Sequence, residues 1–202
     1  MGKIETDHTG SGGGITLSSD GTSLLLDGTA VGGGGGDFVH ISTATITSST
    51  ASVEIGLPSG YDKFYILFDL RSTLKSGLYM QFSQDNGVSY MVSQYTMSQQ
   101  NGSFSANLSW TSATYSGVIC PDRGKFLQGN ITILNASAST NTVFQSTSSN
   151  FAGGGGDTTA IAMSASGMST SQSARINKIK MLGTGSYVWN TGKISLYGIK
   201  ES

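Results

Sequence analysis

In residues 64–71 every second side chain is a large apolar one, while the side chains between them are mostly polar. Successive side chains of a β-strand point to opposite faces of its sheet, whereas an α-helix would repeat its apolar positions every 3.6 residues. The apolar set is Phe64, Ile66, Phe68 and Leu70, and the other set is Tyr65, Leu67, Asp69 and Arg71. The segment therefore predicts a half-buried strand and argues against an amphipathic helix.

Shorter segments of the same kind recur along the chain and are separated by Gly, Ser, Asn and Thr. Charged residues make up only 11% of the sequence, which leaves little for the solvated faces of helices. We predict roughly eight to ten strands in residues 37–202, at the spacing of an all-β fold. The expected architecture is an antiparallel β-sandwich of jelly-roll-like order. The two prolines, Pro58 and Pro121, are predicted to lie in turns. Gly198, inside the last strand, is predicted to mark a bulge or a close approach.

Residues 1–36 are predicted to form a separate anchoring and assembly segment. Asp-Gly at 27–28, between short apolar runs, is a strong hairpin signal. Strands this short bury little surface alone, so we expect them to pack against copies of themselves or against a larger body. The run of five glycines at 32–36 is either a flexible linker or a site of close packing around a symmetry axis. The expected assembly residues are Ile15, Leu17, Leu24, Leu25, Leu26 and Val31.

Composition argues against several classes of function. The net charge is −1 and no basic stripe is present, so nucleic acid is not an expected partner. The single cysteine, Cys120, permits no disulfide within the chain. We expect no membrane insertion and no secretory signal, because no apolar run of the required length occurs. No nucleophile elbow or phosphate loop is present, so we expect no enzyme, no catalytic residues and no cofactor.

The segment Ser83–Tyr90 is similar to the Asp-box pattern Ser-x-Asp-x-Gly-x-Thr-Trp, with Ser89 and Tyr90 departing from it. Its Asp side chain can bond to amides of its own turn, and its Gly can take a positive φ. We therefore interpret Ser83, Asp85 and Gly87 as a structural turn. Asp85, Asp122 and Asp157 fall in predicted loops, where a weak Ca²⁺ site is an alternative. No spaced run of ligands supports it, so no metal is expected.

Four aromatic residues near predicted strand ends or loops are candidates for glycan contact: Trp110, Tyr115, Tyr187 and Trp189. Sugars stack on such rings, and neighbouring Asn and Ser groups would bind the sugar hydroxyls. The alternative for each ring is packing in the core or at an interface.

The segments 15–31 and 192–200 resemble parts of bacteriophage virion β-proteins, such as small tail-fibre, receptor-binding, head-fibre or decoration proteins. The resemblance implies a virion location, a homotrimer, docking on other virion proteins by the N-terminal segment, and a sandwich that projects outward. The leading hypothesis is a non-enzymatic appendage that adsorbs to a host-surface polysaccharide. The alternatives are a capsid decoration or head-fibre protein and a stand-alone carbohydrate-binding module, while a glycan hydrolase has little support.

Overall fold

The computed structural model describes residues 17–19, 24–26, 29–30, 38–91, 95–101, 104–113, 118–137, 141–151, 160–169, 172–183 and 188–200. Every regular element in these ranges is a β-strand, and all strand pairs are antiparallel. The strands are β1 (Leu17–Ser19), β2 (Leu24–Leu26), β3 (Thr29–Ala30), β4 (Phe38–Ile46), β5 (Ser52–Gly56), β6 (Lys63–Ser83), β7 (Tyr95–Asn101), β8 (Phe104–Ala113), β9 (Val118–Leu134), β10 (Val143–Phe151), β11 (Ala160–Ser169), β12 (Lys178–Gly183) and β13 (Thr191–Ile199). Across the described ranges, no helix of the length and hydropathy needed to cross a membrane is present.

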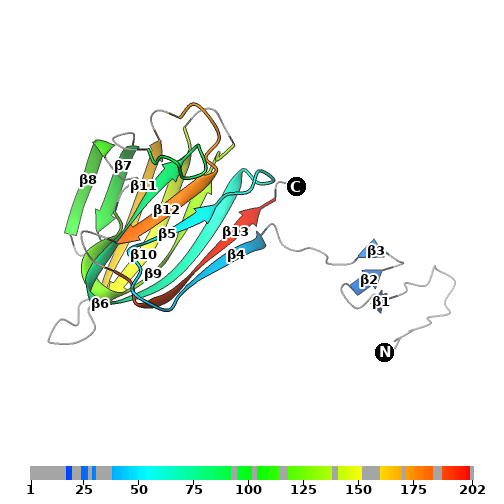
Figure 1. Cartoon of the computed structure of the whole chain (residues 1–202), viewed down its shortest axis with the longest axis horizontal. Helices are drawn as coiled ribbons and strands as arrows, with labels where there is room; N and C mark the ends of the chain where they lie inside the picture. Colours follow the sequence, from blue (N-terminus) through cyan, green and yellow to red (C-terminus); the bar gives the residue numbers. More distant parts are fainter. Residues whose placement is uncertain are drawn as a thin grey trace.

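The short N-terminal strands form a sheet of their own in the order β1-β2-β3. Leu17 pairs with Leu26, and Ser19 pairs with Leu24. Leu26 also pairs with Thr29, the pairing expected on either side of a hairpin at the Asp-Gly signal, and residues 27–28 lie outside the described residues. Figure 1 shows this small sheet beyond the N-terminal end of β4.

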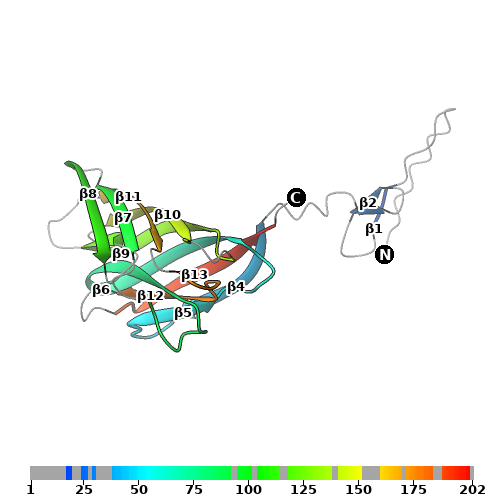
Figure 2. The same cartoon turned by 90° about the horizontal axis from the view of Figure 1, so that it is seen from above.

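The main body is an antiparallel β-sandwich, which confirms the predicted fold class. Its long sheet has the order β4-β13-β6-β9-β10-β11-β7-β8, and β12 pairs with both β5 and β6. The first half of β6 pairs with β13 and the second half with β12, so this 21-residue strand belongs to both layers. Figure 2 shows β5 and β12 lying across from the long sheet.

The core fills the space between the two layers. The inward residues of β6 that the period of two predicted are 0–4% exposed. Ile55 of β5 and Ile179 and Met181 of β12 belong to the same buried cluster, so both layers contribute to it. Each fully buried Leu, Ile or Phe side chain contributes roughly 1.5–3 kcal/mol relative to leaving it in water.

Strand β9 corrects two predictions. Pro121 and Asp122 were expected in a turn or loop, but both lie within β9. Between the pairs Leu78↔Cys120 and Ser76↔Gly124, β9 covers more residues than β6 does. The extra residues of β9 form a bulge at this point. A bulge of this kind accommodates proline, because the unpaired residues need no ladder hydrogen bond.

Candidate functional site

The turn at Ser83–Tyr90 has the hydrogen bonds expected of an Asp-box-like turn motif. The Ser83 hydroxyl donates to Asp85 Oδ1 at 2.7 Å and accepts from the Gly87 N–H at 2.9 Å. Asp85 Oδ1 also accepts from the Ser89 N–H at 2.9 Å, and Asp85 Oδ2 accepts from the Ser89 hydroxyl at 2.5 Å. Gly87 has a φ of 88°, the left-handed region that glycine adopts without strain. These residues therefore close a structural turn.

The same hydrogen bonds set the charge of the turn. The Ser89 hydroxyl, then the Ser89 N–H and the Ser83 hydroxyl, lower the pKa of Asp85 from 3.8 to about 2. These donors favour the ionised carboxylate. Asp85 is therefore an anion whose oxygens are already occupied by its own loop. Among the described side chains, no three His, Cys, Asp or Glu residues gather as metal ligands would.

The structure places the four aromatic residues predicted to contact glycan in different environments. Trp189 is 0% exposed, so the prediction of a surface contact is wrong for this residue. Its backbone pairs with Thr50 through hydrogen bonds of 2.8 and 2.9 Å, and this bridge directs the indole into the core. Trp110 lies within β8 and pairs with Met97. Tyr115 and Tyr187 lie outside the described residues.

Of the predicted assembly residues, Leu17 lies in β1, and Leu24, Leu25 and Leu26 form β2. Ile15 and Val31 lie outside the described residues. The strand pairing holds these leucines in one three-stranded sheet.

The long sheet brings together a different set of surface residues. We define the outer face as the solvent-facing side of β4, β13, β6, β9, β10 and β11. Strand pairing places its side chains in two neighbouring rows. Each row crosses six neighbouring strands that are about 4.8 Å apart, so it is roughly 24 Å long. In strand order, one row is His40, Tyr197, Tyr65, Thr132, Gln145 and Ser166, and the next is Thr43, Ser195, Leu67, Asn130, Thr147 and Ser164.

Three neighbouring rings begin the first row, and we call His40, Tyr197 and Tyr65 the aromatic row. The His40 and Tyr197 ring centroids are 5.4 Å apart in an edge-to-face arrangement. Tyr65 meets the exposed ring of Phe38 in the same manner, also at 5.4 Å. His40 Nε2 lies 2.9 Å from Thr43 Oγ1, which is 2.9 Å from Ser195 Oγ. These contacts hold the rings in place on a rigid sheet.

The rest of the outer face carries mostly hydroxyl and amide groups. Charged side chains lie near both ends of the part of β6 that pairs with β13. Lys63 is at one end, and at the other Arg71 Nε is 4.0 Å from Asp69 Oδ1 and the guanidinium lies 5.3 Å from the centre of the Phe126 ring. Hydroxyl and amide groups both donate and accept hydrogen bonds. The outer face therefore presents rings beside uncharged hydrogen-bonding groups, a combination that suits a ligand with both C–H surfaces and hydroxyls.

Sequence reasoning missed the aromatic row, although one signal was available. Tyr65 and Tyr197 occupy the polar positions of two clearly alternating strands, which marks them as outward-facing. Residues 65 and 197 become neighbours only through the register of β13 on β6. That register depends on pairing between strands far apart in the chain.

No family model and no curated protein matches the chain. Among solved structures, the chain is similar to the crystal structure of exo-inulinase from Aspergillus awamori, with 14% sequence identity and a TM-score of 0.39. The likeness covers 93% of this chain and 35% of that enzyme's chain, so this chain spans about a third of the enzyme's length.

Proposed function

We propose that this chain is a non-enzymatic protein of a phage virion appendage, which adsorbs to host-surface glycans through the outer face of its long sheet. The observation that carries the proposal is the aromatic row of His40, Tyr197 and Tyr65, which lies next to hydroxyl and amide side chains on the same face. The virion setting and attachment through residues 1–36 rest on the sequence resemblance.

The chemistry of the outer face supports a glycan ligand. A sugar ring has an apolar C–H side that packs on aromatic rings, and hydroxyls that pair with Ser, Thr, Asn and Gln side chains. The bonded chain His40–Thr43–Ser195 holds one side of this surface in a fixed arrangement. A pre-organised surface loses less side-chain entropy on binding, and this favours affinity.

The contacts of the described carboxylates support a non-catalytic role. Asp62 accepts hydrogen bonds from the Ser137 N–H and hydroxyl, and Asp85 is held in its turn. Glu54 Oε2 lies 3.3 Å from Lys178 Nζ, and Asp69 lies beside Arg71. Glu54, Asp62 and Asp85 thus have structural partners, while Asp69 Oδ1 makes no hydrogen bond in the described structure and has only the Arg71 Nε at 4.0 Å. A glycoside hydrolase needs two carboxylates that face one sugar bond.

The small N-terminal sheet supports an assembly role for residues 1–36. Its strands are two or three residues long and pair only with one another among the described strands. A sheet of this size buries little apolar surface alone, so contact with copies of itself or with a virion protein would stabilise it. A homotrimer would provide such contacts through a closed ring of identical interfaces.

The test is binding of the full chain to an array of bacterial surface polysaccharides, with Tyr65→Ala and Tyr197→Ala as variants. We expect each variant to lose about tenfold in affinity, which corresponds to 1.4 kcal/mol. Val88→Ala is the surface control, because Val88 is 87% exposed at the Ser83–Tyr90 turn, away from the outer face. Unchanged binding by both tyrosine variants would refute the role of the aromatic row.

Two other results would favour the alternatives. A chain that binds no polysaccharide but binds capsids through residues 1–36, and raises their melting temperature, would be a decoration or head-fibre protein. A chain that stays monomeric and binds glycan after residues 1–36 are removed would be a stand-alone carbohydrate-binding module.

A further inference from the structure

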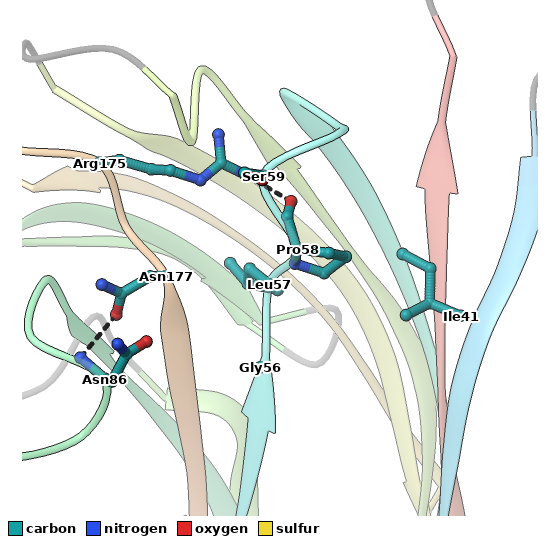
Figure 3. A pocket seen from close by; sticks show the side chains of 8 residues that line it. All are labelled: Ile41, Gly56, Leu57, Pro58, Ser59, Asn86, Arg175 and Asn177. Carbon is teal, nitrogen blue, oxygen red and sulfur yellow. Dashed lines mark hydrogen bonds between the residues drawn. The ribbon is translucent and has the colours of Figure 1, made fainter.

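A groove of about 500 Å³ lies where β5 ends and β12 begins, apart from the outer face. Figure 3 shows the turn at Leu57 and Pro58 in its middle, with Ile41 of β4 on one side and Asn86 and Asn177 on the other. Binding sites for small molecules commonly measure 300–1,000 Å³ and combine apolar walls with a few fixed polar groups. This groove falls within that size range and has both kinds of lining, and it is open to solvent, since Pro58, Ser59 and Asn86 are exposed.

Arg175 lies at one end of the groove, and its charge has no partner of opposite sign. Its Nη2 donates to the carbonyl oxygens of Pro58 and Tyr61, both at 2.7 Å. Its Nε is buried and has no hydrogen-bond acceptor in the described structure. No described carboxylate lies within ion-pair distance of it. A half-buried cation without a counter-ion is unfavourable, and an anionic ligand would relieve that cost.

The neighbouring charges do not compensate Arg175. Lys178, just beyond Asn177, is already paired with Glu54 at 3.3 Å. Asp85 precedes Asn86, but the Ser83 and Ser89 donors of its own turn occupy its oxygens. The groove therefore offers one partly exposed cation that has no described carboxylate as a partner and could pair with an anionic ligand.

Two uncharged groups in the groove are available for hydrogen bonds. Asn177 is occupied, because its Oδ1 accepts from the Asn86 N–H at 2.9 Å and its Nδ2 donates to the Gln84 carbonyl oxygen at 2.6 Å. The Asn86 side-chain amide and the Ser59 hydroxyl both line the groove, and neither makes a hydrogen bond to another described residue. Asn177 thus fixes the turn, while Asn86 and Ser59 can contact a ligand.

We propose that this groove is a second binding site, which takes an acidic sugar residue by its carboxylate. The solvent-accessible part of the Arg175 guanidinium would donate to the carboxylate, and charge-assisted hydrogen bonds of this type are among the stronger ones. Asn86 and Ser59 would contact ring hydroxyls, and Leu57, Pro58 and Ile41 would face the C–H side of the ring. The inference deepens the proposed function by naming a class of glycan, and it shares with it only the premise that the ligand is a sugar.

The test is an NMR titration of the full-length protein with D-glucuronate, with D-glucose and acetate in parallel. We expect glucuronate to shift the amide signals of Ser59, Asn86 and Asn177, and the other two compounds to leave them in place. Shifts of equal size with acetate would mean a general anion site and would overturn the sugar assignment. An absence of shifts in the groove would overturn the proposal.

Asn86→Gly is a suitable variant, because Asn86 has a φ of 58° and glycine adopts that conformation readily. It removes the amide and keeps the backbone, and we expect several-fold weaker glucuronate binding. Arg175→Lys keeps the charge but loses the planar guanidinium and its several N–H donors. We expect it to weaken glucuronate binding more than Asn86→Gly does, with amide signals outside the groove unchanged. Wild-type affinity in both variants would overturn the assignment of these residues.

Tyr65→Ala separates this proposal from the proposed function. We expect it to weaken polysaccharide binding on the outer face and to leave the glucuronate shifts of the groove unchanged. If glucuronate shifts only the signals of the outer face, the groove proposal is wrong and the proposed function stands. If the groove binds glucuronate while Tyr65→Ala and Tyr197→Ala bind polysaccharide normally, the role of the outer face is wrong and the groove stands.

Discussion

Gly198 is a position where a single added methyl group should disturb the sandwich. A Cβ built on Gly198 would lie 2.3 Å from Tyr61 Cδ1 and 2.5 Å from both Cε1 and Cγ. Side-chain carbons do not approach other heavy atoms closer than 3.0 Å, so the ring would have to move. Tyr61 packs against Phe64 of the core, with ring centroids 6.1 Å apart, and this limits the movement. This close approach is the one predicted for Gly198 from its place in the last strand.

We therefore expect Gly198→Ala to lower the free energy of unfolding by about 1–3 kcal/mol, the usual range for overpacking. The measurement is urea unfolding followed by tryptophan fluorescence. In a Tyr61→Ala background the obstructing ring is gone, so the same substitution should cost close to nothing. The coupling energy between the two substitutions should be about 1–3 kcal/mol. Its sign should be that of a steric clash between residues 198 and 61, opposite to the sign of a favourable contact.

Gly60→Ala is the matched control, because nothing lies within 4 Å of a Cβ at that position. We expect its effect to stay within about 0.5 kcal/mol, as is usual for surface substitutions. If Gly198→Ala destabilises the protein equally with and without the Tyr61 ring, the steric argument is refuted.

Two further predictions concern the turn and the core. The pKa of Asp85 is lowered from 3.8 to about 2, so its contribution to stability is present above about pH 4 and lost as the pH falls through 2. Urea midpoints measured across that window should fall more for the wild type than for Asp85→Asn, and parallel curves would contradict this. Trp189→Ala should cost about 3–5 kcal/mol, since a large buried side chain is removed from the core. Trp189→Phe should cost much less, because the buried indole N–H has no partner in the described structure, and equal losses in thermal unfolding of both variants would argue against this.

Local pattern predicted much of the fold correctly. The alternation in residues 64–71 identified the buried side of β6, and the Asp-Gly signal placed a hairpin between β2 and β3. The turn at Ser83, Asp85 and Gly87 was also predictable, because its hydrogen bonds join residues no more than four positions apart. These features depend on backbone preferences and short-range contacts, which a sequence displays directly.

Positions that depend on long-range pairing could not be predicted in this way. Trp189 looked like a surface residue near a strand end, but its bridge to Thr50 places it in the core. Pro121 looked like a turn residue, but an offset in the pairing of β6 with β9 accommodates it inside a strand. In both cases the deciding partner is far away in sequence.

The sequence by itself determined the fold class and its local turns, because strand alternation and turn chemistry act between near neighbours. Only the tertiary structure decided which surfaces carry the candidate sites. The aromatic row exists because β13 pairs with β4 on one side and β6 on the other, which brings residues 40, 65 and 197 together. The groove exists because the connection before β12 lies against the turn after β5, where Arg175 contacts the carbonyls of Pro58 and Tyr61. Strand register and the packing of two layers set these juxtapositions, and neither is a property of any single segment.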